Sequence, residues 1–206
     1  MKNNYANNIG ILISGRGTNM ENIIKACEKD SIPGKVAIVI SDNPSAAGIE
    51  IAQLHAVPTK IIERKSFSSK EEFESEIIKC LNEHQANLVC LAGFMRILSP
   101  VFIRAFSSKI INIHPALLPS FPGLHAQKQA LDYGVKIAGA TVHFVDEGVD
   151  TGPIIIQQIV TIDENDTEES LSQKILEKEH QIYPEAIRLF FEGKLAIEGR
   201  KVKISK

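Results

Sequence analysis

Short apolar runs rich in β-branched residues alternate with amphipathic stretches of helical period along the first half of this chain. This alternation is typical of a mostly parallel sheet that helices cover on both faces. Strands are expected at Ile9–Ile13, Val36–Ile40, Thr59–Ile62, Leu88–Leu91 and Ile110–Ile113. Helices are expected at Asn19–Lys29, Ala46–Ala56, Lys70–Glu83 and Pro100–Phe106, with Ser68 or Ser69 as an N-cap and Ser99-Pro100 opening the last.

After Pro119 the pattern changes. The elements expected there are a helix over Ala126–Tyr133 that ends at Gly134, strands over Ala138–Val145 and Pro153–Val160, a helix from Thr167 to about Phe191, and a hairpin of Leu195–Ile197 and Val202–Ile204. The connection between the two longer strands is too short for a crossover helix, so they should be antiparallel. The sequence thus predicts one α/β domain over residues 1–206, with a mostly parallel, Rossmann-like twisted sheet of about seven strands.

The charge balance is close to neutral, with 23 basic and 25 acidic residues. A nucleic-acid-binding protein usually carries a basic stripe, and here basic residues gather only at Lys201, Lys203 and Lys206. A solvated edge explains that cluster better, so no nucleic-acid partner is expected.

The cysteines and the N-terminal residues indicate the cellular compartment of the protein. Cys27, Cys80 and Cys90 are odd in number and lack CxxC spacing, which indicates free thiols in a reducing compartment. No apolar run approaches the roughly 18 residues of a membrane span, and Met1–Asn8 has no signal-peptide core. We expect a cytoplasmic protein without a membrane partner.

The first strand runs directly into Ser14-Gly15-Arg16-Gly17-Thr18-Asn19 and then a helix. Glycines allow a tight turn, and unpaired N–H groups at a helix start attract an anion, so the loop favours a phosphomonoester. A dinucleotide site is the alternative, since Asp42 has the spacing of a ribose-binding acid, but Met20 replaces the third glycine of that fingerprint. A purely structural turn is the other alternative.

A second polar group follows the fifth strand. Strand alternation places Asn112 and His114 on the same face, at the carboxyl end. An amide and an imidazole at these positions can donate hydrogen bonds to an oxygen that becomes negatively charged. Asp150, in the loop between the antiparallel strands, is a possible third partner, although a turn or capping role would also explain it. A metal site at His114 and Asp150 is a further alternative, but the histidines show no paired ligand spacing.

Four motifs together resemble the folate-dependent phosphoribosylglycinamide formyltransferases of purine synthesis. They are Ser14-Gly15-x-Gly17-Thr18-Asn19, Leu91-Ala92-Gly93-Phe94-Met95-Arg96-Ile97-Leu98, Asn112-Ile113-His114-Pro115-x-Leu117-Leu118-Pro119 and His143-x-Val145-x-x-x-x-Asp150-x-Gly152-Pro153. The resemblance spans almost the whole chain in order, with Ala116 standing where many relatives have serine.

The resemblance implies transfer of a formyl group from 10-formyltetrahydrofolate to the amine of glycinamide ribonucleotide, with Asn112, His114 and Asp150 as catalytic residues. Asn112 and a protonated His114 would stabilise the tetrahedral oxyanion. The Asp150 carboxylate is expected to raise the pKa of His114 and keep it charged near neutral pH. Either His114 or an ordered water would carry the proton.

The resemblance also implies binding roles. Gly17, Thr18 and Asn19 hold the phosphate of the substrate, and Glu179 contacts its ribose. The domain would then have a phosphate-binding half of about residues 1–100 and a half of about residues 88–190 for folate binding and catalysis. The residues expected at the folate are Lys70, Met95, Arg96, Ile97, Leu98, Asp146, Glu147, Gly148 and Val149. Lys70 replaces an arginine of some relatives. A monomer or homodimer without a metal is expected.

Other functions remain possible on the sequence alone. Within the same superfamily these are methionyl-tRNA formyltransferase, a sugar-nucleotide formyltransferase and formyltetrahydrofolate hydrolase. The tRNA enzyme carries an additional C-terminal domain that 206 residues are not expected to hold. The hydrolases carry an additional N-terminal regulatory domain, which is not expected here because the first strand comes almost at the start of the sequence. From another class, a dinucleotide-dependent oxidoreductase or a silent nucleotide-binding module would share the fold.

Overall fold

The computed structural model describes residues 7–205. The first six residues, examined above for a signal peptide, and Lys206 of the C-terminal lysine cluster lie outside this range. The chain divides into two compact units, the first ending at Ile111 and the second starting at Asn112. The boundary falls inside one strand, β5 (Ile110–His114).

The first unit is an α/β unit with parallel strands. Its strands are β1 (Asn8–Ile13), β2 (Lys35–Ser41), β3 (Thr59–Ile61) and β4 (Leu88–Leu91), in the order β3-β2-β1-β4 with the start of β5 next. Its helices are α1 (Thr18–Glu28), α2 (Ala47–Leu54), the 3-10 turn η1 (Arg64–Ser66), α3 (Lys70–Glu83) and α4 (Pro100–Ala105). β1 pairs in parallel with both β2 and β4, and every residue of β1 is buried. The carboxyl ends of these strands therefore share one edge of the sheet.

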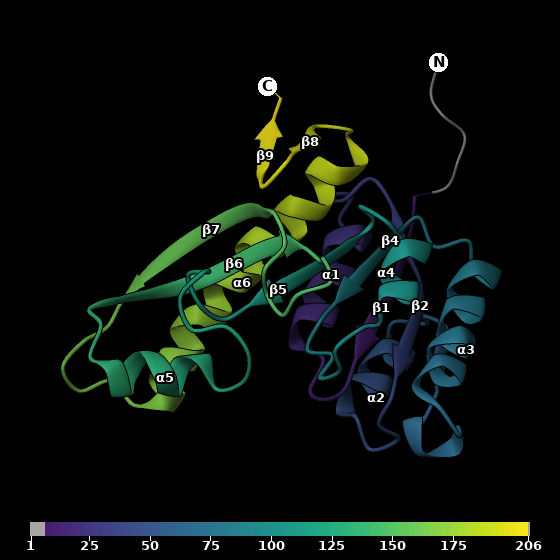
Figure 1. The fold of residues 1–206 in the computed structure, drawn as a ribbon, viewed down its shortest axis with the longest axis horizontal. Helices are drawn as coiled ribbons and strands as arrows, with labels where there is room; N and C mark the ends of the chain where they lie inside the picture. The colour runs from purple at the N-terminus through teal and green to yellow at the C-terminus, as the bar shows by residue number, and fades with distance from the viewer. Residues whose placement is uncertain (1–6, 206) are drawn as a thin grey trace. The chain divides into compact units, whose positions relative to one another are not determined.

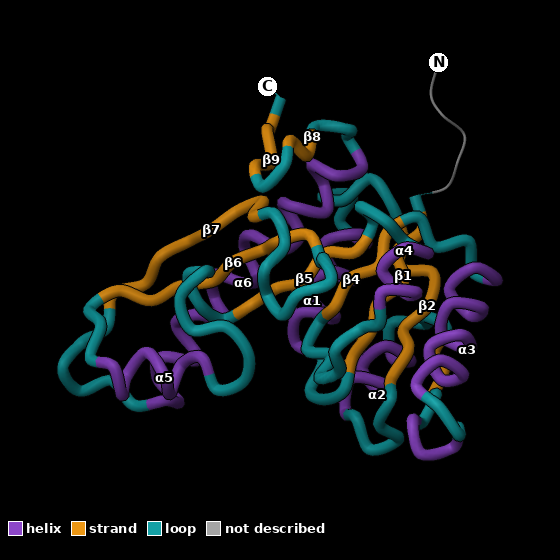
Figure 2. The backbone as a smooth tube through the Cα atoms, in the orientation of Figure 1, coloured by secondary structure: helices purple, strands orange, loops and turns teal. Residues whose placement is uncertain are grey.

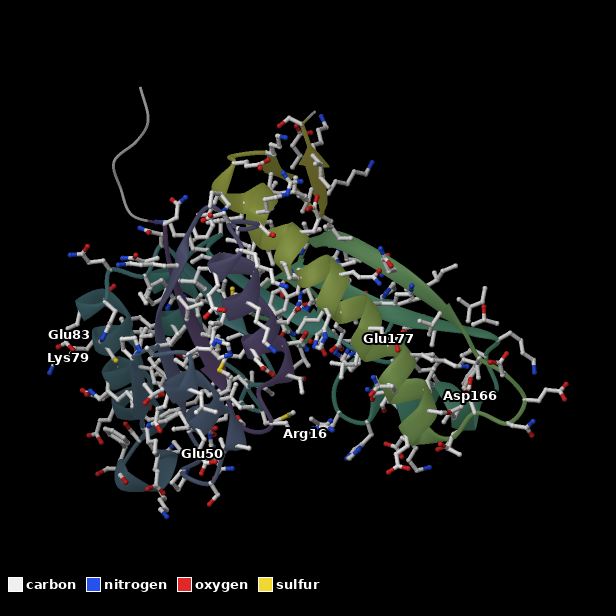
Figure 3. The ribbon with its side chains drawn as sticks, turned by 180° about the vertical axis from the view of Figure 1, so that it is seen from behind. Arg16, Glu50, Lys79, Glu83, Asp166 and Glu177 are labelled. Atoms are coloured by element: carbon white, nitrogen blue, oxygen red, sulfur yellow. The ribbon has the colours of Figure 1, made fainter. Side chains whose placement is uncertain are left out.

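Helices of the first unit pack in pairs, α1 with α2 and α3 with α4 (Figure 1). Ser69 caps α3 by accepting the Glu72 N–H, and Ser99 caps α4 by accepting the Phe102 N–H. Lys79 and Glu83 lie on the solvent side of α3 (Figure 3). The opposite side of α3 contributes Phe73, Ile77 and Leu81 to the core.

The second unit is built on a long helix. It contains α5 (Ala126–Tyr133), β6 (Ile137–Phe144), β7 (Ile154–Thr161), α6 (Glu168–Phe191), β8 (Leu195–Glu198) and β9 (Lys201–Ile204). Its strands follow the end of β5 in the order β5-β6-β7-β9-β8. α6 runs beside β6 and β7, where its apolar residues are buried, while Glu177 lies on its exposed side and Asp166 precedes its start (Figures 1 and 3).

The predicted fold class is confirmed, with one addition. β6 and β7 are antiparallel as expected, and β8 and β9 form the expected antiparallel hairpin (Figure 2). The hairpin also joins the main sheet, because β9 pairs in parallel with β7 at Lys201 and Ile154. The sheet therefore has nine strands rather than about seven. Within residues 7–205, no helix combines the length and the apolar character that a membrane span requires.

Candidate active site

Asn112 and His114 lie at the carboxyl end of β5, as strand alternation predicts. The His114 side chain is buried, at 6% exposure, and its Nε2 lies 2.9 Å from the carbonyl oxygen of Phe121. Since a carbonyl only accepts, Nε2 carries a proton and donates it. Asn112 is half-buried beside it.

Asp150 reaches both of these side chains from the loop between β6 and β7. Its Oδ2 lies 3.3 Å from Nδ1 of His114 and accepts the N–H of Gly123 at 2.8 Å. Its Oδ1 lies 3.5 Å from Nδ2 of Asn112. Asp150 has a φ of 54°, a left-handed backbone conformation that aspartate tolerates better than most residues. The second unit therefore brings the three predicted catalytic residues together.

His143 belongs to the same cluster, although the sequence reading gave it no role. Its Nδ1 donates to the carbonyl of Phe144 at 2.8 Å, and its Nε2 lies 3.7 Å from Oδ1 of Asp150. The same Nε2 lies 3.3 Å from Nδ2 of Asn112. His143 and Asp150 together surround the Asn112 amide, with its NH₂ turned toward the cluster. The only sequence signal was its place in the fourth motif.

The protonation of His114 differs from the expectation. Burial lowers the pKa of His114 below its usual value, and the repulsion of His143 acts in the same direction. The Phe121 carbonyl and the Asp150 carboxylate act in the opposite direction but do not outweigh burial. The expectation that Asp150 raises the pKa of His114 overall is therefore wrong, because it left out the cost of burying the ring.

The pKa of Asp150 lies below its usual value. Burial acts to raise it, but the contacts with His143 and with the Gly123 N–H and the proximity of His114 outweigh that effect. Asp150 is therefore a carboxylate at neutral pH. In the neutral His114 ring Nε2 keeps its proton, so Nδ1, which lies 3.3 Å from the Asp150 carboxylate, is the nitrogen suited to take up a proton as negative charge develops nearby.

Thr141 on β6 holds the segment that follows His114. Its hydroxyl donates to the Ala116 carbonyl at 2.6 Å and accepts the N–H of Leu118 at 3.1 Å. Gln157 on β7 donates to the same hydroxyl and to the Leu118 carbonyl, both at 2.9 Å. Thr141, Ala116 and Leu118 are buried and Gln157 is exposed, so this segment is fixed by side chains rather than by a strand. No sequence pattern indicated this role for Thr141.

The predicted phosphate loop of the first unit has the open helix start that was expected. Gly17 is the N-cap of α1 with a φ of 78°, and no side chain caps the helix. A Cβ on Gly17 would lie 2.7 Å from Cα of Gly48, so both the backbone conformation and the packing of α2 require glycine. Thr18 and Asn19 are half-buried, and Arg16 is exposed (Figure 3). Gly48, which packs against the loop, was not singled out in the sequence.

The predicted folate-binding loop of the first unit, residues 93–98, is partly exposed. Met95 is 67% and Ile97 63% exposed, whereas Leu98 is buried in the core. Arg96 is paired with Asp42, which the sequence had suggested only as a ribose-binding acid. Lys70 lies 3.8 Å from the buried Glu74 carboxylate.

The remaining predicted residues belong to the second unit. Asp146 accepts hydrogen bonds from Thr151 Oγ1 at 2.6 Å and Gly148 N–H at 3.1 Å, which folds the loop that carries Glu147 and the half-exposed Val149. Glu179 is buried on α6. Among residues 7–205, no three His, Cys, Asp or Glu side chains gather so that they could hold a metal ion.

Comparisons with known proteins agree with these motifs. A family model described as formyl transferase matches residues 7–187. The phosphoribosylglycinamide formyltransferase of Bacillus subtilis is 44% identical over 86% of this chain and 91% of its own length. A crystal structure of glycinamide ribonucleotide transformylase 1 from Symbiobacterium toebii has a TM-score of 0.97 and 50% identity, covering 98% of this chain and 96% of that one.

Other relatives are much longer. The trifunctional purine biosynthetic protein adenosine-3 of Drosophila melanogaster is 45% identical over 90% of this chain, which spans only 14% of that protein. The match to the family model and to relatives of similar length is nevertheless nearly complete. By sequence and by fold, this chain belongs to the formyl transferase family and, within it, to the phosphoribosylglycinamide formyltransferases.

Proposed function

We propose that this protein transfers the formyl group of 10-formyltetrahydrofolate to the amine of glycinamide ribonucleotide, giving formylglycinamide ribonucleotide and tetrahydrofolate in purine synthesis. The observation that carries the proposal is the cluster of Asn112, His114 and Asp150, with Oδ2 of Asp150 3.3 Å from the His114 ring. Family membership supports the same reaction. The reaction takes place in the cytoplasm, and no step requires a metal ion.

The proposed transfer is direct. The lone pair of the substrate amine attacks the formyl carbon, so a C–N bond forms and the formyl oxygen becomes an oxyanion. The amide N–H of Asn112 and the Nε2–H of His114 stabilise this charge, the latter in exchange for its hydrogen bond to the Phe121 carbonyl. Donors that are already oriented cost no reorganisation when the charge develops. His143 and Phe144 support this role, because they hold the amide and the neighbouring ring before a substrate binds.

The proton of the attacking nitrogen passes to the leaving nitrogen of the folate. We assign its transport to His114. Burial lowers the pKa of His114, so the ring is able to accept this proton at neutral pH. The developing oxyanion and Asp150 then favour the imidazolium, which returns the proton as the bond to the folate nitrogen breaks. Charge and protons balance without a covalent intermediate on the protein.

The binding roles complete the proposal. In the first unit, Gly17, Thr18 and Asn19 bind the phosphate through the open start of α1, and Lys70, Met95, Arg96, Ile97 and Leu98 contact the folate. In the second unit, Glu179 contacts the ribose, and Asp146, Glu147, Gly148 and Val149 contact the folate. A flat pterin ring needs an apolar slot edged by backbone groups, and Leu98, being buried, would contribute only its backbone.

The test is an assay of the purified protein with 10-formyl-5,8-dideazafolate and glycinamide ribonucleotide. The expected result is formylated ribonucleotide in a one-to-one ratio with deformylated folate. Formate release without the ribonucleotide would instead indicate a hydrolase. A rise in melting temperature with NAD(P)H, and none with folate, would indicate a dinucleotide-binding protein and contradict the proposal.

A further inference from the structure

Arg96 is held from two sides within the first unit. Its Nε donates to Oδ2 of Asp42, which follows β2. Its guanidinium carbon lies 5.6 Å from the centre of the Phe73 ring, close enough for a cation–π contact. The Asp42 side chain is only 6% exposed, whereas that of Arg96 is 43% exposed. A buried anion therefore anchors a half-exposed cation.

The outer end of this arginine has no hydrogen-bond acceptor in the part of the chain that the structure describes. Among residues 7–205, its terminal nitrogens Nη1 and Nη2 donate to no acceptor. A guanidinium that is bound through Nε and stacked on a ring has its plane fixed, so the four remaining N–H groups point in set directions. Such a group has lost its rotational freedom before a ligand arrives.

The Asp42 carboxylate is itself poorly satisfied. Its Oδ1 is buried and has no hydrogen-bond partner in the described part of the chain. A buried carboxylate oxygen without a donor is unfavourable for folding, so stability alone does not explain an aspartate here. What the residue does achieve is the fixed orientation of Arg96.

The backbone path of the loop that carries Arg96, residues 93–98, depends on other residues. At its start, the N–H of Ser14 donates to the Gly93 carbonyl at 3.1 Å, and Ser14 Oγ accepts the Met95 N–H at 3.0 Å. At its end, the N–H of Ser99 donates to the buried Glu74 carboxylate at 2.9 Å. The backbone of residues 93–98 is therefore held at both ends without Asp42. A change at Asp42 should affect the arginine side chain and leave the loop in place.

We propose that Asp42 is a positioning residue for the formyl donor, and that it acts by holding the Arg96 guanidinium ready for the folate. This inference rests on the proposed function, in which Arg96 contacts the folate. It assigns to Asp42 a role in cofactor affinity rather than in the chemical step. The dinucleotide alternative considered for Asp42 requires a free carboxylate, and here that carboxylate is engaged by Arg96.

The test is a double-mutant cycle of D42N, R96Q and D42N/R96Q, with calorimetric binding of 10-formyl-5,8-dideazafolate as the main measurement. D42N should weaken folate binding by roughly 10-fold and raise the KM of the folate, while kcat and the KM of the ribonucleotide change less than about 2-fold. The D42N change should have no further effect in the R96Q background. A residue that merely supports the fold would instead give additive losses.

The matched control is E76Q, which breaks the 2.7 Å ion pair between Lys60 of β3 and Glu76 of α3. It should leave folate affinity unchanged. Equal folate affinity in D42N and the wild type, or additive losses in the cycle, would overturn the inference. If D42N does not fold, D42E replaces it, because glutamate keeps the charge but displaces the carboxylate. An unchanged folate affinity of D42E would also overturn the inference. Absence of folate binding by the wild type would instead reject the proposed function.

Discussion

Oδ2 of Asp150 lies 3.3 Å from Nδ1 of His114, and it also accepts the backbone N–H of Gly123 at 2.8 Å. One carboxylate oxygen thus joins the imidazole to the loop that follows it. The other oxygen of the same carboxylate lies 3.5 Å from the Asn112 amide. Asp150 therefore orients both groups that the proposed mechanism uses against the oxyanion.

Replacement of Asp150 by asparagine should reduce kcat for formyl transfer by roughly 10²-fold or more, because the variant loses the charge that favours the imidazolium. Asparagine accepts the left-handed backbone found here, so the fold should survive. Steady-state kinetics and circular dichroism measure the two effects. Asp132, an exposed residue of α5 paired with Lys128, provides the matched control in D132N. Near-normal turnover of D150N would remove Asp150 from the mechanism.

The lowered pKa of His114 predicts how stability depends on pH. Because the folded protein binds this proton less readily than the unfolded chain, the contribution of His114 is complete above its unfolded pKa of about 6.5 and is lost as the pH falls below that value. The pKa of Asp150 is also lowered, so its contribution is lost only at a more acidic pH, below about 3.8.

Urea unfolding at pH 7.5 and pH 5.5 measures this effect. The free energy of unfolding should fall between the two pH values in the wild type, and the fall should be smaller in H114Q. An identical fall in H114Q and the wild type would contradict the assignment.

Alanine at Gly17 should destabilise the first unit and weaken binding of the phosphorylated substrate. A left-handed backbone costs an alanine about 1 kcal/mol, and the added Cβ would also lie 2.7 Å from Gly48 Cα. Gly134 is a matched control, because it has the same φ of 78° but nothing within 4 Å of an added Cβ. G17A should therefore lose more stability than G134A, and only G17A should raise the KM of the ribonucleotide. Equal losses would show that the contact with Gly48 is unimportant.

Valine at Thr141 should destabilise the protein by about 2–3 kcal/mol, since it leaves the Ala116 carbonyl and the Leu118 N–H without their partner. Chemical denaturation gives the free energy of unfolding. Serine retains the hydroxyl, so T141S should lose clearly less than T141V. A loss of similar size in both variants would mean that packing of the methyl group, rather than the hydrogen bonds, matters at this position.

Much of the fold could be predicted because its signals are local. The Ser69 cap and the αL glycine at position 134 mark ends of α3 and α5 that agree with the predicted bounds. The turn η1 was missed, since three residues show no periodicity. The joining of the hairpin to β7 was also missed, because a single bridge between Ile154 and Lys201 leaves no trace in the local pattern.

Which residues gather at the candidate site could be predicted better than their hydrogen bonds and pKa values. Asn112 and His114 follow from strand alternation, whereas for Asp150 only the resemblance to a family favoured a place beside them over a turn or capping role. His143 and Thr141 were missed as partners because their contacts join residues far apart in the chain. The direction of the His114 pKa was wrong for a related reason: the charge of Asp150 is visible in a sequence, but the degree of burial that opposes it is a property of the packed structure.

The C-terminal hairpin is mostly exposed and adds little to the core, yet Nη2 of Arg200 at its turn donates to the Thr151 carbonyl, one residue beyond Asp150. Mechanical load on the hairpin would reach the loop of Asp150 through this hydrogen bond and through the pairing of β9 with β7. Purification tags, surface immobilisation or fusion partners attached next to β9 would accordingly disturb turnover more than the same additions on the outer side of α3.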